Sequence, residues 1–315
     1  MTLKKPKFWD YKRPNIYSYI LWPLTILIQI INFIRAKFKK QKKFNIRSVC
    51  VGNIYIGGTG KTSLSIKINE ILSKKKIRSC FIKKSYISQI DEQKLLVSKG
   101  KLFTSKKRSE AIIEAKKDNY QIAIFDDGLQ DYSIKYDVSL VCFNNSNWIG
   151  NGMTIPSGPL REGLNNLKNY NHVFLNGNSE NLSNITSTIL NINPSINIYE
   201  GKYVPLNLKD FNLNDNYLAF SGIGNHETFI SMIKDNGMNI VKDIEFSDHY
   251  NFRNEDINKI LDLSKQLNCK IITTEKDYLR LNNLDINEIS YIKSSLKILD
   301  ENNLMKKLIE LNEKN

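Results

Sequence analysis

The stretch Val49–Thr62, which reads VCVGNIYIGGTGKT, decides the fold class of this chain. A short β-rich run leads into a glycine-dense turn that ends in Gly60-Lys61-Thr62, and a helix-like segment follows. This order is typical of a phosphate-binding P-loop, in which glycines let backbone N–H groups point at phosphate oxygens. The strict pattern has a glycine where Tyr55 stands, so the loop departs from it at one position. The stretch therefore predicts a nucleoside triphosphate site.

Each position of this loop has an expected role in nucleotide binding. Lys61 can reach the β- and γ-phosphates, and the Thr62 hydroxyl can ligate Mg²⁺. The helix that follows adds its positive N-terminal end. The residues expected to bind nucleotide are Gly57, Gly58, Thr59, Gly60, Lys61, Thr62 and Ser63.

A pair of carboxylates ends an apolar strand downstream of this loop. Asp126 and Asp127 directly follow the run Gln121–Phe125. P-loop enzymes place the carboxylate that holds Mg²⁺, or its water, at this position. We therefore expect Thr62, Asp126 and Asp127 to form the metal site.

Apolar strands alternate with helical patterns from Asn45 onward, which predicts an α/β protein with a parallel, doubly wound sheet. We expect two α/β/α domains, the first a P-loop NTPase-like parallel sheet, preceded by an N-terminal hydrophobic helix. The predicted division is a membrane-anchoring helix with basic flanks (1–43), a P-loop kinase domain (44–168) and a second, Rossmann-like domain (169–315), whose last helix can pack on the first. Two polar stretches, Asp91-Glu92 and Asn178–Asn197, are predicted to be a loop and a variable surface stretch.

The segment from Ile16 to Ile34 contains no charged residue and is about long enough to cross a hydrocarbon core. Lysines and arginines flank it on both sides, which suits anionic headgroups and fits badly with burial. We predict a membrane anchor that either spans once or lies in the interface; the alternative is a buried core helix. Because the P-loop needs cytosolic nucleotide, the bulk of the chain is expected in the cytoplasm.

The net charge of +14 over 315 residues favours an acidic partner: nucleic acid, an anionic membrane surface or a phosphorylated substrate. The charge is dispersed, and no helix-turn-helix or RNA-binding signature accompanies it, so nucleic acid is not expected. The four cysteines are far apart and lack the spacing of a metal site, which favours buried thiols in a reducing compartment.

Together these segments resemble the tetraacyldisaccharide 4′-kinases, the lipid A 4′-kinases of Gram-negative bacteria. The family's P-loop also lacks the first glycine, and its nucleotide and interdomain motifs have counterparts here. Those counterparts are Asp126-Asp127-Gly128-Leu129-Gln130, Gly150-Asn151-Gly152 with Pro156-Ser157-Gly158-Pro159-Leu160-Arg161-Glu162, Gly222-Ile223-Gly224-Asn225, Phe246-Ser247-Asp248-His249 and Thr274-Glu275-Lys276-Asp277.

The resemblance implies an activity and a set of roles. The activity is transfer of the ATP γ-phosphate to the 4′-hydroxyl of a tetraacylated glucosamine disaccharide 1-phosphate, with Mg²⁺, at the cytoplasmic face of the bacterial inner membrane. It implies Asp91 as catalytic base, paired with His249, and Lys61 as a further catalytic residue. It implies that substrate or phosphate contacts come from Arg108, Gln130, Arg161 and Glu162. No obligate protein partner is expected.

The chain departs from the family pattern at several positions, among them Ser63 and His226, where proline is usual. Lys83-Lys84-Ser85-Tyr86 stands where the family usually has Ser-Arg-Gly-Tyr, and Asp131 stands where a histidine is common. The competing hypothesis is a membrane-associated P-loop ATPase or GTPase switch that acts on a protein partner. A switch would transfer phosphate only to water, whereas a kinase needs a lipid acceptor.

Overall fold

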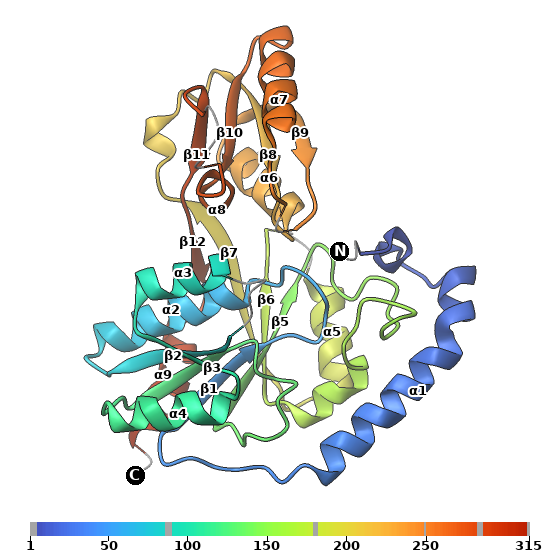
Figure 1. The fold of residues 1–315 in the computed structure, drawn as a ribbon, viewed down its shortest axis with the longest axis vertical. Coiled ribbons are helices and arrows are strands. Elements are labelled where there is room, and N and C mark those ends of the chain that lie inside the picture. Colours follow the sequence, from blue (N-terminus) through green and yellow to red (C-terminus); the bar gives the residue numbers. More distant parts are fainter. Residues whose placement is uncertain (1–4, 86–89, 179–181, 249, 282–285, 314–315) are drawn as a thin grey trace. The chain divides into compact units, whose positions relative to one another are not determined.

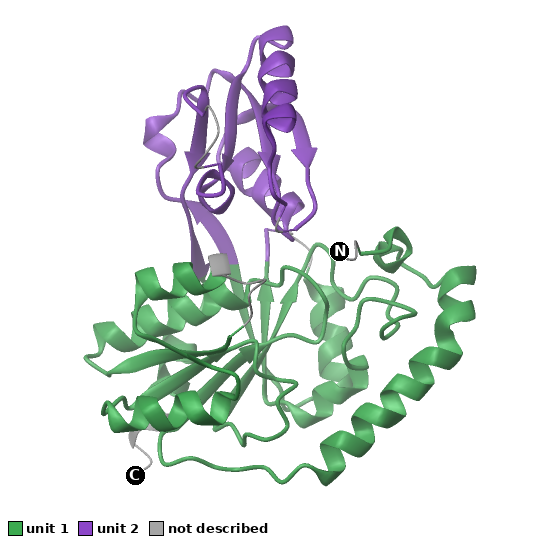
Figure 2. Ribbon diagram, viewed as in Figure 1, with its two compact units in different colours: residues 1–176, 180–201, 298–315 green, residues 177–179, 202–297 purple. Residues whose placement is uncertain are grey.

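The computed structural model describes residues 5–85, 90–178, 182–248, 250–281 and 286–313. It divides into two compact units: unit 1 comprises residues 1–176, 180–201 and 298–315, and unit 2 comprises residues 177–179 and 202–297 (Figure 2). The domain boundaries predicted at 43/44 and 168/169 stay predictions.

Unit 1 is built on a sheet whose strand order is β12-β7-β6-β5-β1-β4-β2-β3. Every neighbouring pair from β7 to β3 is parallel, as the alternating pattern predicts. The strands are β1 (Arg47–Gly52), β2 (Ser79–Lys84), β3 (Leu102–Ser105), β4 (Ile122–Asp126), β5 (Val138–Asn144), β6 (His172–Asn176), β7 (Asn197–Pro205) and β12 (Ser294–Ile298). Strand β1 therefore has β4 on one side and β5 on the other, which brings the carboxyl ends of β1 and β4 together.

Helices cover both faces of this sheet (Figure 1). They are α2 (Lys61–Lys74), α3 (Ile90–Lys99), α4 (Arg108–Lys117), α5 (Ser183–Ile192) and α9 (Glu301–Glu313). Unit 1 also contains the 3₁₀ turns η1 (Lys7–Asp10) and η3 (Leu164–Asn169). The last helix, α9, belongs to unit 1, where Glu301 pairs with Lys67 of α2 at 3.0 Å.

Helices occupy both a stretch expected to be a loop and part of one expected to be a variable surface stretch. Asp91 and Glu92 lie in the first turn of α3, where acidic side chains favour the positive helix end although they look loop-like in sequence. Within Asn178–Asn197, the helix α5 places Ile185, Ile189 and Ile192 against the core at helical spacing. The Asn and Ser residues around these three isoleucines make their helical spacing hard to recognise in the sequence.

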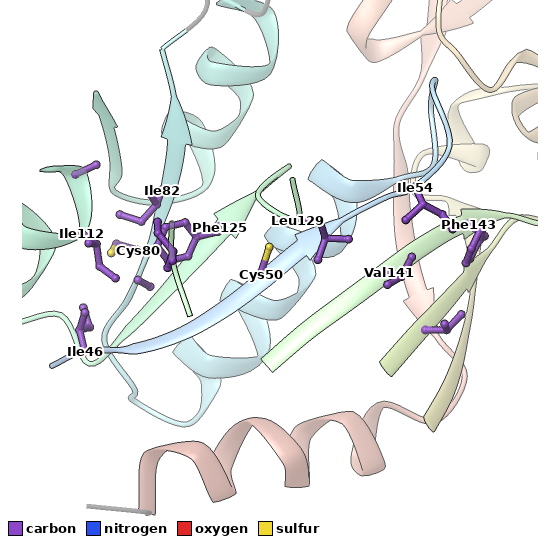
Figure 3. Close-up of a cluster of buried hydrophobic side chains, with 14 of the residues drawn as sticks. Ile46, Cys50, Ile54, Cys80, Ile82, Ile112, Phe125, Leu129, Val141 and Phe143 are labelled. Atoms are coloured by element: carbon purple, nitrogen blue, oxygen red, sulfur yellow. The ribbon is translucent and has the colours of Figure 1, made fainter. Parts of the chain in front are cut away.

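The core of unit 1 lies around β1. Cys50 is fully buried beside Phe125 of β4 and Val141 of β5 in one continuous apolar cluster (Figure 3). Cys80 and Cys142 are also fully buried, so the expectation of buried thiols is confirmed for these three cysteines. The P-loop thus begins on a central, buried strand of the unit, which fixes where the loop starts.

Unit 2 contains a parallel four-stranded sheet with the order β11-β10-β8-β9. Its elements are β8 (Asn216–Ser221), β9 (Asn239–Glu245), β10 (Lys270–Thr274), β11 (Ile289–Ile292), α6 (His226–Asp235), α7 (Asn254–Gln266), α8 (Glu275–Tyr278) and the 3₁₀ turn η4 (Leu208–Asp210). Alternate residues of β8 enter two separate apolar clusters, one with α6 and one with α7. Apolar packing on both sheet faces is the predicted α/β/α arrangement.

The N-terminal hydrophobic segment forms α1 (Ile16–Phe38), and Asn15 caps its first turn by accepting from the Ser18 backbone N–H. It is the one helix among the described residues that is long and apolar enough to cross a membrane. Thirteen of its apolar side chains are exposed, including Ile20 and Phe33 at 66% each. The alternative, a buried core helix, is therefore excluded.

A seam of polar contacts joins α1 to the glycine-rich segment 150–163. The buried Thr25 hydroxyl lies 2.8 Å from the Ser157 hydroxyl, and Asn151 donates to the Ser18 hydroxyl at 3.0 Å. Gln29 also donates to Thr154. The helix thus turns its polar side chains toward the protein and its apolar side chains outward.

Candidate active site

The P-loop closes between β1 and α2 around a buried asparagine. Asn53 directly follows β1, and its amide donates to the Thr59 hydroxyl at 2.9 Å and to the Gly57 carbonyl at 3.4 Å. Gly60 is the N-cap of α2 at a φ of 77°, a left-handed conformation that favours glycine. Helix α2 therefore begins at Lys61, with its free N–H groups at the loop.

Asp126 ends β4 opposite Val51 and points to the start of α2. Its Oδ2 accepts from the Thr62 hydroxyl at 3.2 Å, and its Oδ1 accepts from the Ser65 hydroxyl at 3.3 Å. A hydroxyl beside a carboxylate is an oxygen donor set that suits Mg²⁺ completed by phosphate oxygens and water. The described residues contain no cluster of three or more His, Cys, Asp or Glu side chains that could hold a metal ion alone.

Lys83, which the sequence did not single out as a site residue, reaches the same carboxylate from β2. Its side chain is buried, its ammonium contacts Asp126 Oδ2, and it lies 2.7 Å from Glu92 Oε2. Burial opposes the charged form, but Asp126 and Glu92 outweigh burial and raise the pKa of Lys83 above its usual value. The signal for this residue was the departure of Lys83-Lys84 from the family pattern.

Asp127 pairs with Arg161, whose Nη1 lies 2.8 Å from Asp127 Oδ1. Burial opposes ionisation of Asp127, but Lys61 and Arg161 outweigh it and lower its pKa to about 2. Asp127 adopts a φ of 58°, which turns the chain directly after β4. The two neighbouring carboxylates therefore have different partners.

Gln130 connects this ion pair to Glu162. Its carbonyl oxygen accepts from Arg161 at 3.1 Å, and its amide donates to Glu162 Oε1 at 2.9 Å and to the Asn53 carbonyl at 3.0 Å. The other oxygen of Glu162 accepts from Asn166 and Tyr170, each at 3.2 Å. These contacts hold four of the predicted site residues in one network.

Arg108 is the first residue of α4 and contacts the turn at Asp127. Its Nη2 donates to the Asp127 carbonyl at 2.5 Å, and its Nη1 lies 3.5 Å from Asp131 Oδ2. The Nε of this buried guanidinium has no hydrogen-bond partner among the described residues. Asp131, where the family commonly has histidine, thus gives Arg108 an acidic neighbour.

The segment 150–163 is joined to the P-loop as well as to α1. The Arg161 N–H donates to the Ile54 carbonyl at 2.6 Å, and the Ile56 N–H donates to the Pro159 carbonyl at 2.8 Å. The segment therefore forms a short antiparallel contact with the first half of the loop.

The structure does not describe the side chains of the expected catalytic base, Asp91, and of its expected partner, His249. Asp91 is the second residue of α3, and its side chain lies outside the described residues. His249 also lies outside the described residues. Their roles stay predictions.

The chain is similar to several known proteins. The family model described as LpxK, tetraacyldisaccharide-1-P 4′-kinase, matches residues 17–102 and 91–313. A tetraacyldisaccharide 4′-kinase of Pelagibacter ubique is 59% identical over 315 residues, with 100% of both chains covered. One of Rickettsia canadensis is 33% identical, with 98% of both chains covered.

A solved structure has the same fold. The crystal structure of LpxK from Aquifex aeolicus in complex with ATP matches with a TM-score of 0.65 at 21% identity, covering 94% of this chain and 99% of that one. Its likeness supports the fold, and the family model and the sequence relatives carry the assignment. The chain therefore belongs to the tetraacyldisaccharide-1-P 4′-kinase family.

Proposed function

We propose that this protein transfers the γ-phosphate of ATP to the 4′-hydroxyl of a tetraacylated glucosamine disaccharide 1-phosphate, a step of lipid A synthesis. The observation that carries the proposal is the contact between the Thr62 hydroxyl and Asp126 at a P-loop, in a chain of this family. Phosphoryl transfer depends on positioning and on charge stabilisation, and this cluster supplies groups for both.

In this proposal the loop Gly57–Ser63 surrounds the ATP phosphates with backbone N–H groups, and Lys61 contacts the β- and γ-phosphates. Thr62 and Asp126 would hold Mg²⁺, which neutralises charge on the phosphates when bound. Asp127 is paired with Arg161, so we assign it a less direct part in the metal site than Asp126.

We assign proton removal from the sugar hydroxyl to Asp91, oriented by His249. A carboxylate next to an imidazole can take a hydroxyl proton during attack on the γ-phosphate. Asp91 belongs to the first turn of α3. The next residue of that turn, Glu92, pairs with Lys83, which also contacts Asp126, and this placement of the turn supports the assignment.

We assign phosphate or substrate contacts to Arg108, Gln130, Arg161 and Glu162. A guanidinium binds phosphate through two parallel N–H groups, and the Arg108 Nε has no partner among the described residues, which supports this role. Gln130 and Glu162 would hold Arg161 in position through their shared hydrogen bonds.

The lipid acceptor requires access to a membrane, and we assign this task to α1. Its polar seam with Ser157 and its outward apolar face favour a helix that lies in the interface over one that spans the bilayer. The basic residues around α1 would contact anionic headgroups at the cytoplasmic face of the bacterial inner membrane.

A transfer assay tests this function. The full chain in mild detergent is given γ-labelled ATP, Mg²⁺ and tetraacyldisaccharide 1-phosphate, beside Lys61→Ala, Asp91→Asn and Lys74→Ala. Lys74 lies exposed at the far end of α2 and serves as the matched control. We expect labelled lipid with the wild type and Lys74→Ala, and a loss of at least about a hundredfold with the other two.

ATP consumption without labelled lipid would contradict the kinase and favour the switch. Nucleotide binding separates the two variants, because Lys61→Ala should weaken ATP binding, whereas Asp91→Asn should bind ATP and fail in transfer. Full transfer activity in Asp91→Asn would remove Asp91 from the role of base.

A further inference from the structure

We propose that Lys83 is a positioning residue that stands in for the metal at Asp126, so that Mg²⁺ enters the site with ATP and not before it. The inference rests on the assignment of Thr62 and Asp126 to Mg²⁺ made above. It concerns a residue that departs from the family pattern of serine at this position.

The geometry places the Lys83 ammonium where it competes with a metal ion. It contacts Asp126 Oδ2, the same oxygen that accepts from the Thr62 hydroxyl. Thr62 and Lys83 therefore share one oxygen of the carboxylate that is expected to hold the metal. The side chain is 1% exposed, so water does not screen its charge.

Charge decides the order of binding. A divalent ion arriving alone would meet an Asp126 carboxylate that is already paired with a buried ammonium, and the two cations repel each other. The polyphosphate of ATP brings several negative charges, which attract both Mg²⁺ and Lys61 and offset this repulsion. The metal is therefore favoured only as part of the nucleotide complex.

The same ammonium also bridges two carboxylates from separate elements. Lys83 joins Asp126 at the end of β4 to Glu92 on α3, and without it the two acidic side chains would repel each other across the site. Removing the charge should therefore create an acidic pair that attracts a divalent cation directly.

Equilibrium dialysis of the full chain with Mn²⁺, a spectroscopically visible substitute for Mg²⁺, tests this. Mn²⁺ binding is measured with and without a non-hydrolysable ATP analogue. The variants are Lys83→Met, Lys83→Arg, Glu92→Gln and Asp126→Asn, with the exposed Lys101→Met as the control for loss of a positive charge.

The inference predicts the direction in which each variant changes the affinity for Mn²⁺. Without nucleotide, Lys83→Met binds Mn²⁺ at least about tenfold more tightly than the wild type. Lys83→Arg, Glu92→Gln and Lys101→Met stay as weak as the wild type, because each retains the cation at Asp126. With the analogue, the wild type binds Mn²⁺ and Asp126→Asn loses this binding.

Three results would overturn the inference. If wild-type protein binds Mn²⁺ alone, and Asp126→Asn abolishes this binding, the ammonium does not exclude the metal; this arm needs no Lys83 variant to fold. If Lys83→Met gains no affinity over Lys101→Met, the charge of Lys83 does not control metal entry. Absence of Mn²⁺ binding even with the analogue would overturn the metal assignment of the proposed function as well.

Discussion

Arg161 and Asp127 hold each other across two loops of unit 1, with Nη1 of the arginine 2.8 Å from Oδ1 of the aspartate. Arg161 comes from the glycine-rich segment, and Asp127 comes from the turn after β4. The backbone N–H of the same arginine bonds the P-loop at Ile54. One residue therefore fixes the distance between the nucleotide loop and the acidic turn.

Replacing Arg161 by methionine should lower stability in a pH-dependent way. The pKa of Asp127 is about 2 in the folded chain, below its ordinary value of 3.8, so its ionised form stabilises the fold above about pH 4. This stabilisation is lost as pH falls toward 2. Part of it, up to about 2 kcal/mol at pH 6, should be missing in Arg161→Met. Urea unfolding at pH 6 and pH 3 measures the difference; an equal loss at both pH values would contradict this account.

The hydrogen bond between Thr25 and Ser157 should couple α1 to the glycine-rich segment. Thr25→Val and Ser157→Ala should each lower the free energy of unfolding by about 1–3 kcal/mol, because each leaves a buried polar partner unsatisfied. The double variant should lose less than the sum, with a coupling of about 1 kcal/mol. A double-mutant cycle by chemical denaturation measures this, and strict additivity would rule out the coupling.

Gly158 should tolerate no side chain, whereas Gly163 should. A Cβ at Gly158 would lie 2.1 Å from Asn151 Oδ1 and 2.4 Å from the Met153 carbonyl oxygen. We expect Gly158→Ala to cost about 1–3 kcal/mol or more. At Gly163 a Cβ meets nothing within 4 Å, so Gly163→Ala should stay within about 0.5 kcal/mol of the wild type. Similar melting temperatures for the two variants would argue against the close packing of this segment.

The outward face of α1 should carry membrane binding. Ile20→Glu and Phe33→Glu each place a charge on this face and should reduce binding to anionic vesicles about tenfold or more. Val97→Glu is the matched control, because Val97 is 62% exposed on α3, away from α1. Vesicle co-sedimentation measures the bound fraction, and ATP binding should be unchanged in all three. Equal losses in all three variants would show a general charge effect.

The fold, and the position of the P-loop within it, could be predicted from the sequence because both depend on local order along the chain. A strand, a glycine-rich turn and a helix predict where Lys61 and Thr62 lie, and the strand before Asp126 predicts its place at the same sheet edge. The position of Asp126 beside Thr62 agrees with this reasoning.

Contacts between segments that are far apart in the sequence could not be predicted in this way. Lys83 and Asp126 meet because β2 and β4 are neighbours in the sheet, a strand order that no spacing along the chain reveals. Asn53 and Thr59 meet inside the loop itself, yet a buried asparagine has no distinctive sequence pattern. Asp126 and Asp127 have separate partners because the backbone turns at Asp127, and no sequence pattern predicts this turn.

The seam between α1 and the glycine-rich segment has a practical consequence for preparing this protein. Removing the first 38 residues, a common way to make a membrane-associated enzyme soluble, would uncover Asn151, Thr154 and Ser157. These groups belong to the segment that holds Ile54 and Ile56 of the nucleotide loop. A shortened form should therefore lose affinity for ATP as well as for lipid, whereas detergent that covers only the outer face of the helix should preserve it.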